Sequence, residues 1–314
     1  MIRLGLQIPS FTYPGVADDE LFERIAAQAV AAEESGFDSV FVMDHFYQLP
    51  SLGKSTDRML EAYTLLGALA VRTSTVGLGT LVTGVTYRNP AVLAKIVTTL
   101  DVVSSGRAIL GIGAAWNTEE HDGYGVAFPP AGERLDRLED ALQICRAMFT
   151  QERSTVTGHH HHTVGAFNNP RPVRPDGIPI LVGGGGEKRT LRLVAEYADA
   201  CNLFGPPDVL RHKFAVLDAH CAAVGRDRAE ITRTRLGSVV VGDDKGDADA
   251  VGARYTQERG LDPGMFMAGG PPDIADRIAE YRDAGVEGFI FNMPHTSDPD
   301  DVRRAGSVLR PLVE

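Results

Sequence analysis

Strand-like and helix-like segments alternate along the whole chain, and this alternation limits its possible folds more than any other feature. Apolar runs typical of buried strands occur at 3–8, 39–43, 76–81, 108–112, 178–182, 200–204, 231–241 and 288–292. Segments with apolar residues at helical spacing lie between them, at 18–35, 60–72, 89–106, 133–149, 191–198, 207–224 and 273–285. Because strands that alternate with helices favour a parallel sheet, these roughly eight units in 314 residues predict a (β/α)8 TIM barrel.

A doubly wound open sheet is the alternative fold for this pattern, but no boundary divides the chain into two nucleotide-binding halves. The sequence has no low-complexity linker, so a single domain over residues 1–314 is expected. Residues 150–177 contain prolines, glycines and four histidines, and they predict an extended or hairpin insertion before the fifth strand. Residues 243–272 are acidic and glycine-rich, and they predict a loop region with one or two helices.

Charge and cysteine content narrow the class of protein. The 31 basic and 42 acidic residues give a net charge of −11, which argues against a nucleic-acid partner because phosphate backbones favour basic surfaces. No apolar run is long enough to cross a bilayer, and residues 1–10 lack the apolar region of a signal peptide. The three cysteines lack metal-binding spacing and predict reduced thiols in a cytoplasmic protein.

The stretch 178–204 combines a buried strand, four consecutive glycines and a helix. Glycines between a strand and a helix let backbone N–H groups approach an anion, and the helix dipole adds positive potential. We therefore favour phosphate binding here over a turn that only connects tightly, although the spaced glycines of the dinucleotide fingerprint are not evident. Lys188 and Arg189 would add charge if they point inward. The glycines concerned are Gly183, Gly184, Gly185 and Gly186.

In a barrel the active site lies at the C-terminal ends of the strands. Asp44 and His45 follow the second predicted strand. A histidine can exchange a proton with a substrate hydroxyl or carbonyl near neutral pH, and Asp44 could orient a neighbour or bond to a cofactor ring. The alternative is a helix-capping Asp beside a solvated His. Trp116, the single tryptophan, follows the fourth strand and could either form a wall for a flat ligand or fill the core.

Two other stretches raise the question of metal binding. Residues 119–121 lack the two-His helical spacing of a zinc protease, and we interpret them as the polar start of a helix. In the histidine run 159–162, at most two side chains could share one face of a strand, so a solvated strand or loop is expected. We therefore predict no metal site. No nucleophile elbow or Ser/His/Asp order is present, which disfavours covalent hydrolysis.

Four motifs in order resemble the luciferase-like monooxygenase superfamily, and within it the branch of oxidoreductases that depend on coenzyme F420. They are AAEESGFDSVFVMDHF at 31–46, the segment from GLGTLVTGVTYRNP to AFPP at 77–130, ERLDRLEDAL at 133–142, and PILVGGGGEKRTLRLVAEYADACN at 179–202. The resemblance covers nearly the whole chain. It implies a TIM barrel with an insertion near the strand ends and a deazaflavin lying across the barrel mouth.

The resemblance also implies roles for particular residues. Members similar to this chain place the Asp of the Asp44–His45 pair near the polar edge of the deazaflavin, and the His toward the substrate. A bulge with a non-proline cis peptide would fall at Leu81–Val82, behind the ring. Trp116 would line the substrate pocket where sugar-phosphate-oxidising relatives have a Glu, and this departure puts sugar-phosphate oxidation in doubt. His45 and Trp116 are thus the expected catalytic residues, and the expected cofactor-binding residues are Asp44, Leu81, Val82, Ala114, Gly183, Gly184, Gly185 and Gly186.

The implied reaction is hydride transfer between the deazaflavin and a small organic substrate of the alcohol, carbonyl or enone type, with His45 as the proton donor or acceptor. Gln7 and Asn292 could offer polar contacts. An FMN-dependent monooxygenase on the same barrel, and a protein that binds F420 or flavin without turnover, stay open as alternatives. Relatives commonly associate through barrel helices, so a homodimer is expected, with no nucleic-acid or membrane partner.

Overall fold

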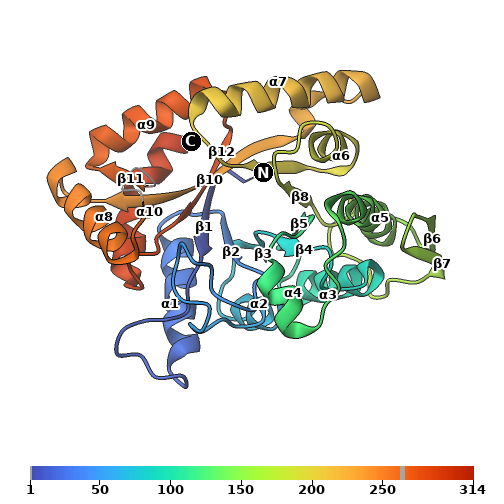
Figure 1. Ribbon diagram of the computed structural model, residues 1–314, viewed down its shortest axis with the longest axis horizontal. Coiled ribbons are helices and arrows are strands. Elements are labelled where there is room, and N and C mark those ends of the chain that lie inside the picture. Colours follow the sequence, from blue (N-terminus) through green and yellow to red (C-terminus); the bar gives the residue numbers. More distant parts are fainter. Residues whose placement is uncertain (1, 262–265) are drawn as a thin grey trace.

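The computed structural model describes residues 2–261 and 266–314 (Figure 1). Within these residues, eight parallel strands form a closed barrel in the order β1 Leu4–Ile8, β2 Ser39–Val42, β3 Gly77–Thr80, β5 Ala108–Gly113, β8 Ile180–Gly183, β9 Ala200–Leu203, β10 Thr232–Val241 and β12 Gly288–Asn292. Strand β9 pairs with β10, and β12 pairs with β1, so the ring closes. The predicted TIM barrel is therefore confirmed, and the open doubly wound sheet is excluded.

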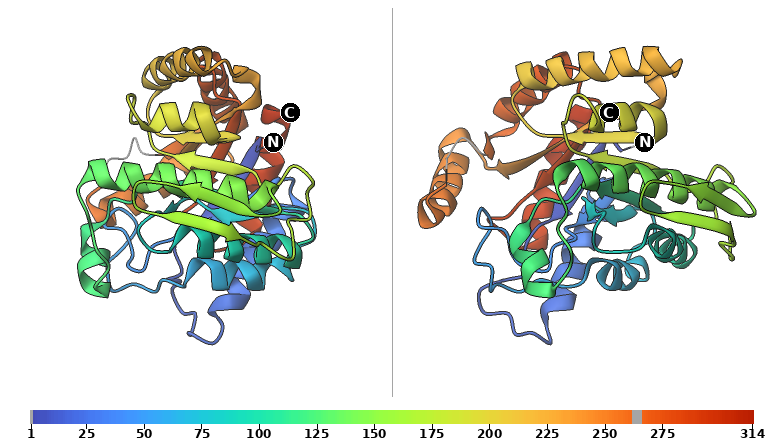
Figure 2. Two further views of the ribbon diagram at one scale, coloured as in Figure 1. Left: turned by 90° about the vertical axis from the view of Figure 1, so that its right-hand side faces the viewer. Right: turned by 45° about the vertical axis from the view of Figure 1, so that its right-hand side comes forward.

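Helices surround these strands on the outside of the barrel (Figure 2). Helix α3 begins as the Asn-Pro signal predicts, because the side chain of Asn89 accepts a hydrogen bond from the N–H of Ala91 at 2.9 Å and Pro90 occupies the first turn. The helices that follow the barrel strands are α1 Leu21–Glu34, α2 Ala62–Ala70, α3 Pro90–Val103, α5 Ala131–Thr150, α6 Thr190–Tyr197, α7 Pro207–Val224, α9 Pro271–Asp283 and α10 Pro299–Val313.

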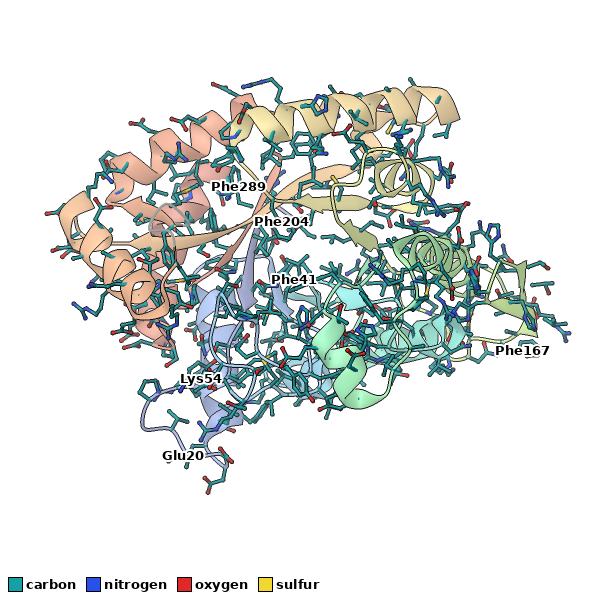
Figure 3. All side chains as sticks on the ribbon, viewed as in Figure 1. Glu20, Phe41, Lys54, Phe167, Phe204 and Phe289 are labelled. Atoms are coloured by element: carbon teal, nitrogen blue, oxygen red, sulfur yellow. The ribbon has the colours of Figure 1, made fainter. Side chains whose placement is uncertain are left out.

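Two apolar layers explain why the strand sequences are continuous apolar runs. One layer fills the barrel and includes Phe41, Ile109 and Leu181 (Phe41 is labelled in Figure 3). The other lies between the strands and the helices and includes neighbours that point outward, such as Val40 and Leu110. Successive strand residues face opposite sides, so both faces of each strand are buried, as is usual for parallel sheets.

The third strand breaks at the barrel mouth. Strand β3 ends at Thr80, and the short strand β4 Thr83–Gly84 continues beside β5 after a bulge. The peptide bond between Leu81 and Val82 in this bulge is cis, as the family resemblance implied. The bulge presses against β5 so closely that a side chain on Gly111 would collide with the carbonyl oxygen of Thr80. Glycine is therefore required at position 111 for this close approach.

The insertion at 150–177 forms an antiparallel hairpin, as predicted. Its strands are β6 Ser154–Thr157 and β7 His162–Ala166, and the hairpin lies against α5 at one end of the molecule (Figure 1). The carboxylate of Asp140 on α5 accepts hydrogen bonds from the backbone N–H groups of His159, His160 and His161. The histidine run therefore forms the hairpin turn and the start of β7, in agreement with the expected loop.

The stretch 243–272 contains one helix, α8 Lys245–Arg259, as predicted, but also a strand that the sequence pattern did not indicate. This strand, β11 Phe266–Gly269, pairs in parallel with the outer end of β10. Its four residues are too few to show alternation, and glycines surround them. The part of the predicted loop at 262–265 lies outside the described residues. Among the described helices, none has the length and hydropathy needed to span a membrane.

The close approach of the bulge to β5 predicts that Gly111→Ala destabilises the protein. A methyl group at this position has no free space, so the free energy of unfolding should fall by about 1–3 kcal/mol or more. Gly67→Ala in α2 is the matched control, because nothing lies within 4 Å of an added methyl there. That change should be neutral or should stabilise by about 1 kcal/mol through helix propensity. Urea unfolding of both variants measures the difference, and equal stabilities would contradict the steric argument.

Candidate active site

The C-terminal ends of the barrel strands surround a cavity of about 660 Å³. All ten residues that the sequence predicted for the site line this one cavity, although they come from four separate segments of the chain. They are Asp44, His45, Leu81, Val82, Ala114, Trp116, Gly183, Gly184, Gly185 and Gly186. Gln7 and Asn292 line it as well.

A hydrogen bond to a buried carboxylate orients His45. Its Nδ1 lies 2.9 Å from Oε2 of Glu120, whose side chain is fully buried, whereas the imidazole of His45 is 15% exposed. If Nδ1 carries the proton and donates it to Glu120, Nε2 is the nitrogen left for a ligand in the cavity. Residues 119–121 lie in the first turn of a helix, α4 Thr118–Tyr124, as predicted. Glu120 has a further role that this prediction did not include, because it binds His45.

Glu120 is itself held by several donors. One carboxylate oxygen accepts the backbone N–H groups of Phe46 at 2.6 Å and Tyr47 at 2.9 Å, and the other accepts the hydroxyl of Tyr87 at 2.8 Å in addition to His45. Burial works to raise the pKa of Glu120, but these hydrogen bonds, led by the one from His45, outweigh burial and lower its pKa below the ordinary value. Glu120 is therefore ionised at neutral pH and can fix the orientation of the imidazole.

Aromatic packing seats α4 against the loop that carries His45. The ring of Phe46 lies 4.5 Å from that of Tyr124 and 4.7 Å from that of Tyr87. The Nδ1–H of His121 donates to the Asn117 carbonyl oxygen at 2.7 Å, and Nε2 of the same ring lies at hydrogen-bond distance, 2.7 Å, from the Thr86 hydroxyl. These contacts fix the position of Glu120 relative to β2.

A bidentate ion pair occupies the carboxylate of Asp44. Both terminal nitrogens of Arg88 donate to it, at 2.7 and 3.0 Å, and Arg88 also donates to Glu61 at 2.6 Å. Burial raises the pKa of Asp44, and the guanidinium of Arg88 opposes that shift. Because both oxygens already have a partner, a cofactor ring could contact Asp44 only through its remaining lone pairs.

Trp116 stands beside His45 at the rim of the cavity. The centroids of the two rings are 5.6 Å apart, with the planes inclined at 68°, and Trp116 is 60% exposed. An exposed indole of this kind is not filling the core, so the structure rules out that alternative for Trp116. Around these two side chains the cavity wall is largely apolar, with Met43, Leu49 and Leu52.

The four glycines form an open turn between β8 and α6. Gly184 has a φ of +122°, which L side chains rarely adopt, and its N–H donates to the Asn202 carbonyl oxygen at 3.2 Å. Within the described residues, the N–H groups of Gly185 and Gly186 have no protein acceptor. Two free amides at a cavity wall fit the anionic side chain of a flavin-type cofactor.

Two details of the predicted phosphate site need correction. Helix α6 begins at Thr190, four residues after Gly186, so the glycines do not themselves form the helix N-terminus. Arg189 points away from the cavity, because it pairs with Asp136 on α5 at 2.6 Å. Lys213 of α7 lies close to the turn instead, and its ammonium group pairs with Glu187 at 2.6 Å.

Polar side chains bridge the far side of the cavity from strand to strand. The Ser238 hydroxyl donates to Asn292 at 2.5 Å, the Asn292 amide donates weakly to Gln7 at 3.5 Å, and Gln7 donates to the carbonyl oxygen of Leu81 at 2.9 Å. Gln7 and Asn292 were expected to contact a ligand. Their structural role is to support the Leu81–Val82 bulge from β1 and β12.

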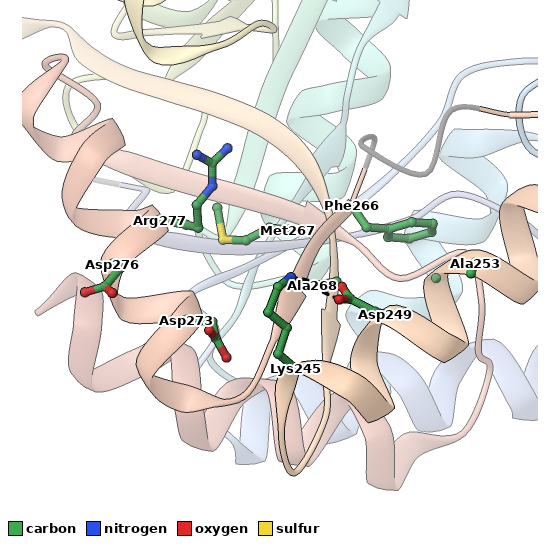
Figure 4. A pocket seen from close by; sticks show the side chains of 10 residues that line it. Lys245, Asp249, Ala253, Phe266, Met267, Ala268, Asp273, Asp276 and Arg277 are labelled. Atoms are coloured by element: carbon green, nitrogen blue, oxygen red, sulfur yellow. Dashed lines mark hydrogen bonds and ion pairs between the residues drawn. The ribbon is translucent and has the colours of Figure 1, made fainter.

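A second hollow, of about 610 Å³, lies between α8, β11 and α9, away from the barrel mouth (Figure 4). Its polar groups largely neutralise one another, since Lys245 forms an ion pair with Asp249. It contains none of the site residues predicted from the sequence. Among the described residues, no group of three or more His, Cys, Asp or Glu side chains could hold a metal ion.

Comparison with known proteins decides the family. The model of the family described as luciferase-like monooxygenase matches residues 2–260. The chain belongs to this family. It is therefore an enzyme of an oxidoreductase family, and the cavity at the mouth of its barrel is the candidate active site.

Individual family relatives and solved structures are similar over most of the chain. An F420-dependent glucose-6-phosphate dehydrogenase of Segniliparus rotundus is 33% identical over 248 residues, which are 78% of this chain and 67% of that protein. The structure of an F420-dependent secondary alcohol dehydrogenase with an F420-acetone adduct matches 100% of this chain and 99% of its own, with a TM-score of 0.81 and 21% identity. An FMN complex of the oxygenating constituent of 3,6-diketocamphane monooxygenase from Pseudomonas putida matches 99% and 98%, with a TM-score of 0.77 and 18% identity.

Sequence reasoning missed two residues that hold the site of this luciferase-like protein. Glu120 and Arg88 contact the predicted pair His45 and Asp44 from 75 and 44 positions away in the sequence. No spacing rule connects residues so far apart. The available signal was chemical: the acidic group 119–120 follows the fourth barrel strand, as Asp44 and His45 follow the second, and the ends of all barrel strands meet at one mouth.

The depressed pKa of Glu120 predicts a pH-dependent contribution to stability. A carboxylate whose pKa is lowered on folding stabilises the protein above its unfolded pKa, and loses that contribution as the pH falls through its folded pKa. Glu120→Gln should therefore reduce the unfolding free energy at pH 7 by about 1.5–3 kcal/mol. The difference from the unmodified protein should shrink below the ordinary glutamate pKa of 4.5. Thermal melts between pH 7 and pH 3.5 measure it, and a difference independent of pH would contradict an ionised Glu120.

Proposed function

We propose that this protein is an F420-dependent oxidoreductase that transfers a hydride between the deazaflavin coenzyme and a small, neutral organic substrate. The observation that carries the proposal is the arrangement of His45, with Nδ1 bound to Glu120 and the ring exposed to a cavity beside Trp116. An oriented imidazole can exchange the proton that must accompany a hydride when an alcohol and a carbonyl are interconverted.

The residues lining the cavity fit the proposed cofactor. The free N–H groups of Gly185 and Gly186 can donate hydrogen bonds to an anionic oxygen, and the Leu81–Val82 bulge offers an apolar surface to a flat ring. F420-dependent enzymes also stand among the relatives in sequence and among the structures of similar fold. When bound, the deazaflavin supplies a ring carbon that accepts or releases a hydride.

The chain's own contribution would be proton transfer and orientation. For alcohol oxidation, the hydride leaves the carbinol carbon while the hydroxyl proton passes to Nε2 of His45. Reduction of a carbonyl reverses both transfers. Reduction of an enone would instead place the hydride on the β-carbon and the proton from Nε2 of His45 on the α-carbon. Glu120 stabilises the imidazolium formed in the oxidative direction and keeps Nδ1 from contacting the substrate. Trp116 would hold the substrate against His45 and limit access of water.

The composition of the cavity supports a neutral substrate. Near His45 the lining combines apolar residues with Asp44, Ser51 and Tyr87, and the nearby cation Arg88 is bound to two carboxylates. Among the described lining residues, Arg235 is the single arginine or lysine, and it lies on β10, three strands from β2 in the barrel. A sugar phosphate at His45 would find no partner for its charge, so we favour an alcohol, a carbonyl compound or an enone.

The family also contains FMN-dependent monooxygenases, and an FMN complex is among the structures of similar fold. An FMN-dependent monooxygenase is therefore the second candidate, and a protein that binds cofactor without turnover is the third. The expected homodimer, the single domain and the cytoplasmic location stay predictions.

Cofactor titration distinguishes the first two candidates. The protein should bind F420 more tightly than FMN, because its site lies in a chain that resembles the F420-dependent branch and carries the Asp44–His45 pair. Fluorescence titration of each cofactor into the apoprotein, at the same ionic strength, gives the two dissociation constants. FMN binding that equals or exceeds F420 binding would overturn the proposal in favour of a monooxygenase. Hydride exchange with a panel of alcohols, aldehydes and enones then separates an enzyme from a binding protein.

Replacement of His45 tests the proton transfer. A positioned acid or base contributes about 10²–10⁴-fold to rate, so His45→Ala should slow turnover by that factor and leave F420 affinity nearly unchanged. His212→Ala is a matched control, because this histidine is exposed on α7 and does not line the cavity. Steady-state kinetics and thermal melts of both variants provide the comparison. A folded His45→Ala protein with unchanged turnover would remove His45 from the mechanism.

A further inference from the structure

Arg235 is a buried cation for which the described residues supply no anionic partner. Its side chain is 8% exposed, and its Nε and Nη1 atoms make no hydrogen bond to any described residue. Its charged neighbour among the described residues is another cation, Arg277. Removal of a charge from water without a partner is strongly unfavourable, so such a group calls for an explanation outside folding stability.

Other arginines in the same region have acceptors. Arg233, two residues earlier on β10 and equally buried, forms an ion pair with Asp218 of α7. Arg277 of α9 pairs with Glu280 at 2.5 Å. Among the described residues, Arg233 and Arg277 therefore each have a carboxylate partner, although Nε of Arg233 also lacks an acceptor, whereas Arg235 has no carboxylate partner.

The position of Arg235 connects it with the active-site cavity. Leu236 packs against the interior of the barrel, so the side chain of Arg235 leaves the strand on the opposite face, where its guanidinium stacks on Tyr281 at 4.0 Å. The guanidinium extends along β10 to the level of Gly237, where an added side chain would collide with it. Arg235, Gly237 and Phe204 all line the cavity at the place where β9 ends beside β10.

Arg235 lies on the same side of the mouth as the glycine turn. The turn follows β8, and β9 is the single strand between β8 and β10 in the barrel order. On the other side, β12 and β1 separate β10 from β2, which carries His45. An anion at Arg235 would therefore belong to the molecule that contacts the glycines rather than to the group that reacts at His45.

We infer that Arg235 binds an anionic oxygen, a phosphate or a carboxylate, on the side chain of the bound cofactor, as a second anchor beside the amides of Gly185 and Gly186. This inference rests on the proposed function, since it takes the cavity to be a cofactor site. It accounts for the unpaired charge, because the cofactor oxygen would supply a counter-charge at Nη2, the guanidinium nitrogen that is not among the fully buried unpaired atoms. The Tyr281 ring holds the guanidinium in place until then.

The test compares a cofactor with its own chromophore lacking the anionic side chain. F420 and the corresponding deazariboflavin are titrated by fluorescence into the unmodified protein, Arg235→Met, Arg235→Lys and Arg277→Met. Arg235→Met should weaken F420 binding by about ten- to a hundredfold and leave deazariboflavin binding unchanged, because one charge-assisted hydrogen bond is lost. Arg235→Lys should recover part of the loss. Arg277→Met removes the other guanidinium near Tyr281, outside the cavity, and should bind both molecules normally.

Thermal melts of the apoproteins separate this role from a structural one. Since none of the residues that the structure describes pairs with the Arg235 charge in the apoprotein, Arg235→Met should melt at the same or a higher temperature. Unchanged F420 affinity in Arg235→Met would overturn the inference, as would equal loss of both ligands together with a lower melting temperature. If the unmodified protein binds no deazaflavin, the proposed function fails, and FMN with riboflavin replaces the pair. Selective loss of FMN in Arg235→Met would then support the anion site, and equal affinities would reject it.

Discussion

The mouth of this barrel depends on a close contact between the backbone of the bulge after β3 and the backbone of β5, at a glycine that carries no side chain. The carbonyl oxygen of Thr80 lies against Gly111, and Val82 packs over Gly113 of β5 and Gly183 of β8. Since three neighbouring positions carry only hydrogen, the third strand can bend inward and close the floor of the cavity. Gly183, which packs against Val82, is also the last residue of β8 and the first of the four glycines. The bulge at the cavity floor and the glycine turn therefore meet at one residue.

Two adjacent residues before α3, Tyr87 and Arg88, determine the positions of the Asp44–His45 pair after β2. Arg88 binds Asp44 through two hydrogen bonds, and Tyr87 binds Glu120, which in turn binds His45. Buried carboxylates are costly unless donors surround them. Glu120 has donors from two segments, and Asp44 has both terminal nitrogens of Arg88. The orientation of the Asp44–His45 pair is therefore a property of the contact between two loops, not of the β2 loop alone.

The fold could be predicted from the sequence because every barrel strand is buried on both faces and so appears as an apolar run. The ten lining residues could be predicted because strand ends converge in a barrel and because the motifs resemble a known family. The supporting residues could not. Glu120 was interpreted as part of an ordinary polar helix start, because its role depends on a contact with His45, 75 residues away in the sequence. Arg235 looked like one of two equivalent arginines on a strand, and only the absence of a described partner distinguishes it. Strand β11 was not predicted because its four residues are too few to show a periodic pattern.

The length of β10 has a consequence for how the mouth can vary. Its residues 232–238 pair with β9 and β12 inside the barrel, whereas residues 238–241 pair with β11 outside it. Strand β11 and helix α8 are thus attached to the end of β10 that extends beyond the barrel. Their hydrophobic cluster, which includes Val240, Tyr255 and Phe266, is separate from the main core. A unit attached in this way can be lengthened, shortened or exchanged without unpairing a barrel strand. The unit of α8 and β11 is therefore a replaceable module, able to diverge while the barrel strands and the cavity that they surround stay constant.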